Sequence, residues 1–251
     1  MPTILKRKYG QNFLIDNNIL NKISNLVPSE NLNILEIGPG NGKLTDKIIL
    51  KKPSGLTLIE IDKDLIKYLE SRYTKNKEIE LINEDILKIK LNKKYQLVIS
   101  NLPYNISSQI LVKLSLLNIT PDILILMFQK EFAQRLLDKK LNSINSLVRC
   151  FFDIKLNFNV SKNCFRPIPK VESSVLTFKK KNKKLITKKE VDSFILFKRK
   201  LFSHKRKSLK NILKKYNLNI NLDLNYRVED LKLEELVKLF RAVNFEIYRR
   251  N

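Results

Sequence analysis

The first 130 residues alternate short apolar runs with segments in which Leu and Ile recur every three or four positions. The apolar runs have the length of strands, and the periodic segments have the spacing of amphipathic helices. This alternation predicts a doubly wound α/β sheet. The predicted strands are 33–37, 55–61, 80–83, 96–100 and 122–128, and the predicted helices are 17–27, 43–50, 63–73 and 107–117.

The pattern changes after Lys130. Residues 131–137 and 143–151 have helical spacing, and 155–160 and 171–178 read as an antiparallel strand pair around a loop that contains prolines. The block 179–184 is almost entirely lysine, and because like charges repel, it is predicted to be a linker. The expected domains are therefore 1–180, the α/β sheet, and 187–251, a small all-helical domain.

The chain is strongly basic, with 49 Lys plus Arg against 25 Asp plus Glu, a net charge of +24. Such an imbalance favours a polyanionic partner, above all a nucleic acid. An AT-rich genome would also enrich Lys, Asn and Ile, and a basic protein can bind membrane surfaces, although no long basic amphipathic helix stands apart here. In the segment 197–210, apolar residues recur among cations, which predicts a helix or helix pair whose basic face is either for phosphates or simply solvated.

Few residues suited to metal or thiol chemistry are present. Cys150 and Cys164 lack metal-ligand spacing, and His204 is the single histidine, so neither a metal site nor a histidine-activated nucleophile is expected. The basic start has no apolar stretch of a secretory signal, and no run is long enough to span a bilayer. A reduced, cytoplasmic protein without membrane association is predicted.

A Gly-rich turn follows the first predicted strand, in the run Glu36-Ile37-Gly38-Pro39-Gly40-Asn41-Gly42. Glycines allow a sharp turn and the close approach of a ligand. A dinucleotide-binding fingerprint would place its third Gly where this chain has Lys43. The observed spacing, with an acid two positions before the first Gly, is instead typical of S-adenosylmethionine-dependent methyltransferases.

Two further acids follow the next strands. Glu60 ends the second strand and can accept hydrogen bonds from both hydroxyls of a ribose, and Asp85, after the third strand, can bind an adenine amine. Ile61 and Ile86 stand beside them in the predicted cofactor site. A tight turn or a solvated loop acid would explain any one of these residues alone. Their occurrence at successive strand ends favours a ligand site, because open α/β sheets bind ligands there.

The tetrapeptide Asn101-Leu102-Pro103-Tyr104 follows the fourth predicted strand. The Asn101 side-chain oxygen and a backbone carbonyl can accept both hydrogens of an exocyclic amine, and Pro103 restricts the backbone that presents them. The ring of Tyr104 offers a face on which a flipped base can stack. The alternative is an ordinary turn at a strand end, because Asn and Pro are common there.

These motifs resemble the ribosomal RNA adenine N6,N6-dimethyltransferase family, in particular its bacterial small-subunit type, over nearly the whole chain. The matching segments are Gly10-Gln11-Asn12-Phe13-Leu14, Glu36-Ile37-Gly38-Pro39-Gly40, Asn101-Leu102-Pro103-Tyr104-Asn105-Ile106-Ser107-Ser108, Gln129-Lys130-Glu131, Phe165-Arg166-Pro167-Ile168-Pro169-Lys170-Val171-Glu172-Ser173-Ser174-Val175 and Lys205-Arg206-Lys207-Ser208-Leu209-Lys210-Asn211. One departure is visible: relatives carry Tyr-Gly-Arg-Leu-Ser near the place where this chain has Ile144-Asn145-Ser146-Leu147. The missing Arg puts RNA positioning there in doubt.

The resemblance implies a Rossmann-like methyltransferase sheet with a small helical C-terminal domain. It implies that S-adenosyl-L-methionine is bound by Asn12, Leu14, Gly38, Gly40, Glu60, Ile61, Asp85, Ile86 and Asn101. It further implies that the target adenine is held by Asn101, Leu102, Pro103 and Tyr104, with Phe165 stacking on its other face. The implied substrate is a pair of adjacent adenines near the 3′ end of small-subunit rRNA, in an immature 30S-type subunit, and the implied enzyme is a monomer. The alternatives are a large-subunit adenine methyltransferase of the antibiotic-resistance type and a non-catalytic RNA-binding assembly factor.

Overall fold

The computed structural model of the protein describes residues 12–28, 31–216, 218 and 220–250. Contacts divide the chain into two compact units. The first, here called the sheet unit, is Met1–Gln134 with Ile154–Lys180; the second, the helical unit, is Arg135–Asp153 with Lys181–Asn251. The sequence predicted one boundary, between 180 and 187. The structure differs by assigning Arg135–Asp153 to the helical unit.

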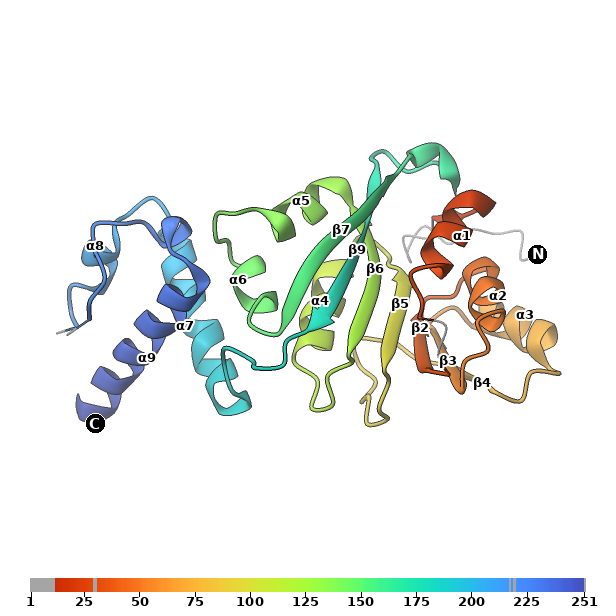
Figure 1. The fold of residues 1–251 in the computed structure, drawn as a ribbon, viewed down its shortest axis with the longest axis horizontal. Helices are drawn as coiled ribbons and strands as arrows, with labels where there is room; N and C mark the ends of the chain where they lie inside the picture. The colour runs from red at the N-terminus through yellow and green to blue at the C-terminus, as the bar shows by residue number, and fades with distance from the viewer. Residues whose placement is uncertain (1–11, 29–30, 217, 219, 251) are drawn as a thin grey trace. The chain divides into compact units, whose positions relative to one another are not determined.

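The sheet unit is built on a seven-stranded sheet with the order β4-β3-β2-β5-β6-β9-β7 among the described residues (Figure 1). Strands β2 to β6 are parallel and β9 is antiparallel to β6. The direction of strand order reverses between β2 and β5, and open α/β sheets form their ligand crevice at such a point. The strands are β2 (Asn33–Ile37), β3 (Gly55–Glu60), β4 (Ile79–Asn83), β5 (Leu97–Asn101), β6 (Ile123–Gln129), β7 (Phe152–Val160) and β9 (Ser173–Lys180).

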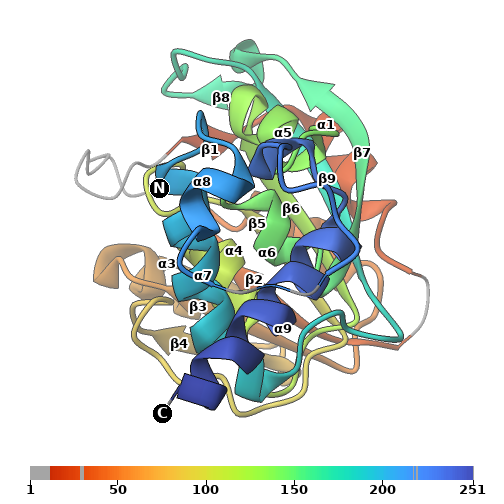
Figure 2. The ribbon, with the colours of Figure 1, turned by 90° about the vertical axis from the view of Figure 1, so that its left-hand side faces the viewer.

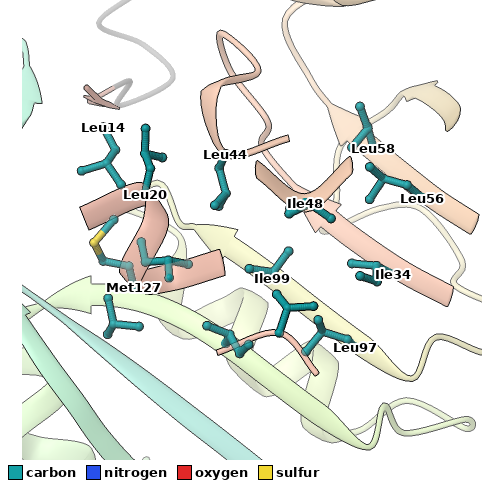
Figure 3. Close-up of a cluster of buried hydrophobic side chains, with 14 of the residues drawn as sticks. Leu14, Leu20, Ile34, Leu44, Ile48, Leu56, Leu58, Leu97, Ile99 and Met127 are labelled. Carbon is teal, nitrogen blue, oxygen red and sulfur yellow. The ribbon is translucent and has the colours of Figure 1, made fainter. Parts of the chain in front are cut away.

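Three helices cover one face of this sheet: α1 (Asn17–Ser24), α2 (Lys43–Ile49) and α3 (Lys63–Tyr73). Alternate residues of the strands pack against them, and Figure 3 shows Ile34, Leu58 and Ile99 in one buried cluster with helix residues. Helix α4 (Ser107–Ser115) joins β5 to β6 in the opposite strand direction, so a right-handed crossover places it on the other face. Both faces of the sheet are thus buried, which explains the nearly continuous apolar strands.

The predicted strands and helices of the first 130 residues are confirmed, with ends that differ by at most three residues. A second, two-stranded sheet was not predicted. Strand β1 (Phe13–Leu14) pairs antiparallel with β8 (Phe165–Arg166), so that Leu14 lies opposite Phe165. A strand of two residues has no measurable periodicity, and its partner lies far away in the sequence.

The predicted linker 179–184 is wrong in its first two residues, because Lys179 and Lys180 belong to β9. The charges that were expected to repel one another are compensated by acids. Lys180 forms an ion pair with Asp122 in the sheet unit, and Lys181 forms one with Asp153 in the helical unit.

The helical unit contains α6 (Asn145–Val148), α7 (Val191–Ser203), α8 (Leu209–Leu213) and α9 (Leu233–Arg250), and α5 (Lys130–Leu137) crosses the boundary between the units. Helices α7 and α9 lie side by side (Figure 2), with the Phe240 ring centroid 5.2 Å from that of Phe194 and 5.6 Å from that of Phe197. The segment 197–210 contains the end of α7, a non-helical connection at 204–208 and the first two residues of α8, so it joins two helices, as one form of the prediction had it. No helix in the described part of the chain is both long and apolar enough to cross a bilayer.

Candidate active site

A pocket opens at the carboxyl ends of β2, β3 and β5, and its space free of protein atoms, including the part open to solvent, is about 950 Å³. Most of the residues predicted from the sequence line it together. These are Asn12, Leu14, Gly38, Gly40, Glu60, Ile61, Asp85, Ile86, Asn101, Leu102, Pro103 and Tyr104.

Strand geometry explains why three of the polar residues meet. Side chains two positions apart on a strand point to the same face. Glu36, Glu60 and Asn101 each come two residues after an apolar residue of the cluster beneath α1–α3. The carboxyl ends of these parallel strands lie side by side, so their last polar side chains converge on one pocket.

The Gly-rich turn leads from β2 into α2. Gly38 has a φ of +64°, and a Cβ added there would meet nothing within 4 Å, so this backbone faces open space. Gly42 has a φ of +78°, and a Cβ there would lie 2.5 Å from the Tyr73 hydroxyl. That hydroxyl lies 2.9 Å from the Gly42 carbonyl oxygen, and Arg72 forms an ion pair with Asp46 of α2. Side chains from α2 and α3 therefore hold the turn from the side away from the pocket.

Glu60 is buried at the end of β3, where backbone N–H groups hold its carboxylate. Its two oxygens accept hydrogen bonds from the N–H groups of Gly40, at 3.2 Å, and Asp62, at 3.0 Å. Burial raises the pKa of Glu60, and these donors act against the rise. The carboxylate is thus tied to the Gly-rich turn beside the pocket, as a ribose-binding acid would be. Asp85, in the loop after β4, accepts a hydrogen bond from the Leu87 N–H at 2.9 Å.

Glu36 also lines the pocket, although the sequence reasoning used it only as a mark of the Gly-rich turn. It is 1% exposed, and the Thr45 hydroxyl donates a hydrogen bond of 2.7 Å to its carboxyl group. Burial raises the pKa of Glu36 to about 8, and the nearby negative charges of Asp46 and Glu60 contribute to the rise. Its position on the same strand face as Ile34 is the signal that would have placed it in the site.

The loop Asn101–Tyr104 after β5 is held at several points. The Asn101 side-chain Nδ2 donates a hydrogen bond of 3.0 Å to the Asn12 carbonyl, which fixes the side-chain amide and leaves Oδ1 on its other side. The Tyr104 hydroxyl lies 2.6 Å from Ser173 Oγ, and the Ser107 hydroxyl donates to the Tyr104 carbonyl at 3.1 Å. Burial raises the pKa of Tyr104, so its phenol stays protonated. The loop is an ordered part of the pocket wall.

Phe165 is the predicted site residue that the structure places elsewhere. It is completely buried in the apolar cluster with Leu14 and Val160, and it does not line the pocket. The cause is the β1–β8 pairing, which lays Phe165 against Leu14. The structure therefore contradicts the expectation that its ring is available to stack on the second face of an adenine. Gly10 and Gln11 of the N-terminal motif lie outside the described residues.

Two features of the helical unit bear on RNA binding. Lys198, counted among the cations for phosphates, is 5% exposed, and its amine donates to the Ser143 carbonyl at 2.5 Å. Lys205, Arg206, Lys207 and Lys210 are exposed, so a basic surface remains around the α7–α8 connection. Within the part of the chain that the structure describes, no three His, Cys, Asp or Glu side chains are grouped to hold a metal ion.

A sheet of this strand order, with helices on both faces, a Gly-rich turn after β2 and the Asn101–Tyr104 loop in the same pocket, defines a Rossmann-like methyltransferase with a C-terminal helical region. A model of the family described as ribosomal RNA adenine dimethylase matches residues 3–245. The chain belongs to this family.

Similar proteins agree with that assignment. A protein named ribosomal RNA small subunit methyltransferase A in Mycoplasmopsis pulmonis is 41% identical, over 94% of this chain and 97% of its own. Its namesake in Malacoplasma penetrans is 44% identical, over 84% of this chain and 78% of its own. The crystal structure of a dimethyladenosine transferase from Plasmodium falciparum has a TM-score of 0.81 at 26% identity, over 93% of this chain and 98% of its own. The 23S rRNA methyltransferase ErmE, at 22% identity and a TM-score of 0.74, shares the fold.

Proposed function

We propose that this protein transfers methyl groups from S-adenosyl-L-methionine to N6 of two adjacent adenines near the 3′ end of small-subunit rRNA, dimethylating each. The observation that carries the proposal is the Asn101–Tyr104 loop, which lines the same pocket as the acids suited to a nucleoside cofactor. The small-subunit names of relatives that are 41% and 44% identical support the choice of rRNA. The substrate would be an immature 30S-type subunit in the cytoplasm, and the enzyme would act as a monomer.

The pocket suits S-adenosylmethionine in charge and in polarity. This cofactor carries a positively charged sulfonium and an ammonium group, and two buried carboxyl groups, Glu36 and Glu60, border the pocket. Ile61 and Ile86 add apolar surface for an adenine ring. When bound, the cofactor supplies an electrophilic methyl group on a good leaving group. The residues that would hold it are Asn12, Leu14, Gly38, Gly40, Glu60, Ile61, Asp85, Ile86 and Asn101.

The loop residues act on the target base. The N6 amine of adenine is a poor nucleophile because its lone pair is delocalised into the ring. Hydrogen bonds from this amine to Asn101 Oδ1 and to the Leu102 carbonyl would favour a pyramidal nitrogen and stabilise its developing positive charge. The amine loses its proton readily only after it is methylated, so the chain needs no strong base before the attack. Stacking on Tyr104 would offset part of the cost of extruding the base from its helix.

The helical unit would supply contacts with the RNA backbone. Exposed Lys205, Arg206, Lys207 and Lys210 are suited to phosphates, and their contribution would depend strongly on salt. The place of the Arg that relatives carry is filled differently. In the nearby run Ile144–Leu147, Asn145 is completely buried, and its amide nitrogen donates to the Lys140 carbonyl at 2.9 Å. RNA positioning would therefore rest on the other basic residues of this unit.

The test is methyl transfer to ribosomal particles from cells that lack this gene. Purified protein is incubated with isotope-labelled S-adenosylmethionine and with 30S or 50S particles, and the modified nucleosides are located by mass analysis of the rRNA. Dimethyladenosine at two adjacent positions near the 3′ end of the small-subunit rRNA is expected. Transfer to the 50S particle would instead support the large-subunit enzyme. Cofactor binding without any transfer, or no cofactor binding, would support an assembly factor.

A further inference from the structure

The Tyr104 side chain is held at both of its ends. At the backbone end, its carbonyl accepts the hydrogen bond from the Ser107 hydroxyl at the start of α4. At the ring end, its hydroxyl shares a 2.6 Å hydrogen bond with Ser173 Oγ. The hydrogen bonds of a phenol lie close to the plane of its ring, so the bond to Ser173 Oγ favours the ring orientation whose plane points towards Ser173. A preferred ring orientation pre-organises a stacking surface.

Ser173 is itself rigidly placed. It is completely buried at the start of β9, and it lies opposite Gln129 in the β6–β9 register. The Lys130 backbone N–H donates to the Glu172 carbonyl at 2.9 Å, and the Lys130 amine forms an ion pair of 2.6 Å with the Glu172 carboxylate. Hydrogen bonding and the positive charge of Lys130 lower the pKa of Glu172. These contacts fix the backbone that carries Ser173 Oγ.

The same contacts involve two family motifs that have no assigned role in the proposed methyl transfer. Gln129-Lys130-Glu131 spans the end of β6 and the start of α5, and Val171-Glu172-Ser173-Ser174 ends with the first two residues of β9. The ends of these two segments are joined by the Lys130–Glu172 contacts directly beside Ser173. Together these contacts hold the Ser173 hydroxyl at a fixed position beside the loop Asn101–Tyr104.

We propose that Ser173 is a positioning residue for the methyl transfer, acting through the Tyr104 hydroxyl to hold the ring in the orientation that stacks on the target adenine. This inference rests on the proposed function, because the base to be stacked is the adenine of that reaction. Phe165, being buried, leaves Tyr104 as the predicted stacking residue that lines the pocket. The orientation of this one ring therefore matters more than it would between two aromatic side chains.

The chain offers a matched control one residue away. Ser174 is 2% exposed on the same strand, and its hydroxyl donates a 2.7 Å hydrogen bond to Asn159 Oδ1. Successive side chains of a strand point to opposite faces, so Ser174 points away from Tyr104. Ser174→Ala thus removes a buried hydroxyl and a hydrogen bond, as Ser173→Ala does, without touching the catalytic loop.

The kinetic experiment is a double-mutant cycle on methyl transfer to 30S particles. Ser173→Ala and Tyr104→Phe should each lower kcat/KM by roughly two- to tenfold, the effect of one neutral hydrogen bond, mainly through a higher KM for the particle. The double variant should be no slower than the slower single variant, because both changes remove the same bond. Effects that multiply, or an equal loss in Ser174→Ala, would overturn the proposal.

A second measurement requires no RNA, so it separates failure of this inference from failure of the proposed function. The protein is labelled with fluorotyrosine at its eight tyrosines, and the Tyr104 fluorine signal is identified by its loss in Tyr104→Phe. Ser173→Ala should shift or broaden that signal, whereas Ser174→Ala should leave it in place. An unchanged signal in Ser173→Ala would refute the positioning role even if the wild-type protein methylates its substrate as proposed.

Discussion

Replacing Glu36 by Gln should remove much of the pH dependence of the protein's stability. Burial raises the pKa of Glu36 from an ordinary value of 4.5 to about 8. The folded protein therefore keeps a proton that the unfolded chain releases, so stability is fully present below pH 4.5 and falls as the pH rises towards 8. Gln is neutral at every pH, and its side-chain oxygen can still accept the hydrogen bond from Thr45.

The expected magnitude follows from the shift. One pKa unit corresponds to about 1.4 kcal/mol, so the Glu36 carboxyl alone should lower the free energy of unfolding by roughly 3–4 kcal/mol between about pH 5 and about pH 8. The variant should consequently be little different from the wild type near pH 5 and clearly more stable near pH 8. Such a gain is a large fraction of a typical protein stability.

The assay is urea denaturation without cofactor, followed by circular dichroism at several pH values between 5 and 8. Glu70, an exposed glutamate of α3, provides the matched control, and Glu70→Gln should follow the wild-type curve. Parallel pH profiles for the wild type and Glu36→Gln would refute the argument, because they would mean that Glu36 is ionised in the folded protein at the same pH as in the unfolded chain.

Three further outcomes are expected. Asn101→Ala should lower kcat for methyl transfer to 30S particles by about 10²-fold or more, since it removes an acceptor for the charge of the transition state; near-normal turnover would exclude that role. Gly42→Ala should destabilise the protein by about 1–3 kcal/mol in urea denaturation, because its φ is +78° and its Cβ would lie 2.5 Å from the Tyr73 hydroxyl. Replacing Lys205, Arg206 and Lys207 by Gln should weaken rRNA binding and flatten its salt dependence in filter-binding assays. If the variant and the wild type lose affinity equally steeply as the salt concentration rises, these residues do not contact the RNA phosphates.

The central sheet was predictable because its strands carry the strongest local signal. Strands buried on both faces read as apolar runs, and 33–37 was placed with its observed ends. Strand ends also fix the site, so Glu60 and Asn101 could be assigned from their positions after apolar runs. The same logic applied to Glu36, whose place on the Ile34 face of β2 was available in the sequence but was not used.

The remaining features depend on long-range contacts between polar or very short segments. Lys198 reads as a solvated cation, yet the Ser143 backbone accepts its hydrogen bond and the amine is buried, with a pKa lowered to about 8 by that burial. This contact and the hydrogen bond from the Leu141 N–H to the Glu229 carbonyl tie Arg135–Asp153 to the rest of the helical unit, and hydropathy gives no sign of them. Phe165 shows the same limit: a motif identifies an aromatic residue, but the β1–β8 pairing decides which way it faces.

The buried acids Glu36 and Glu60 link the stability of the protein to ligand binding in the pocket. Glu36 and Glu60 both have raised pKa values because burial disfavours their charged forms, and a fold selected for stability alone would not keep two such groups beside one pocket. A cationic ligand reverses this preference, since it favours the ionised carboxylates and releases protons as it binds. Affinity for such a ligand should therefore increase as the pH rises towards 8, while the stability of the unliganded protein decreases. A pocket that binds a cation should therefore show rising ligand affinity and falling stability over the same pH range. The affinity for a neutral ligand of the same shape should not rise with pH in this way.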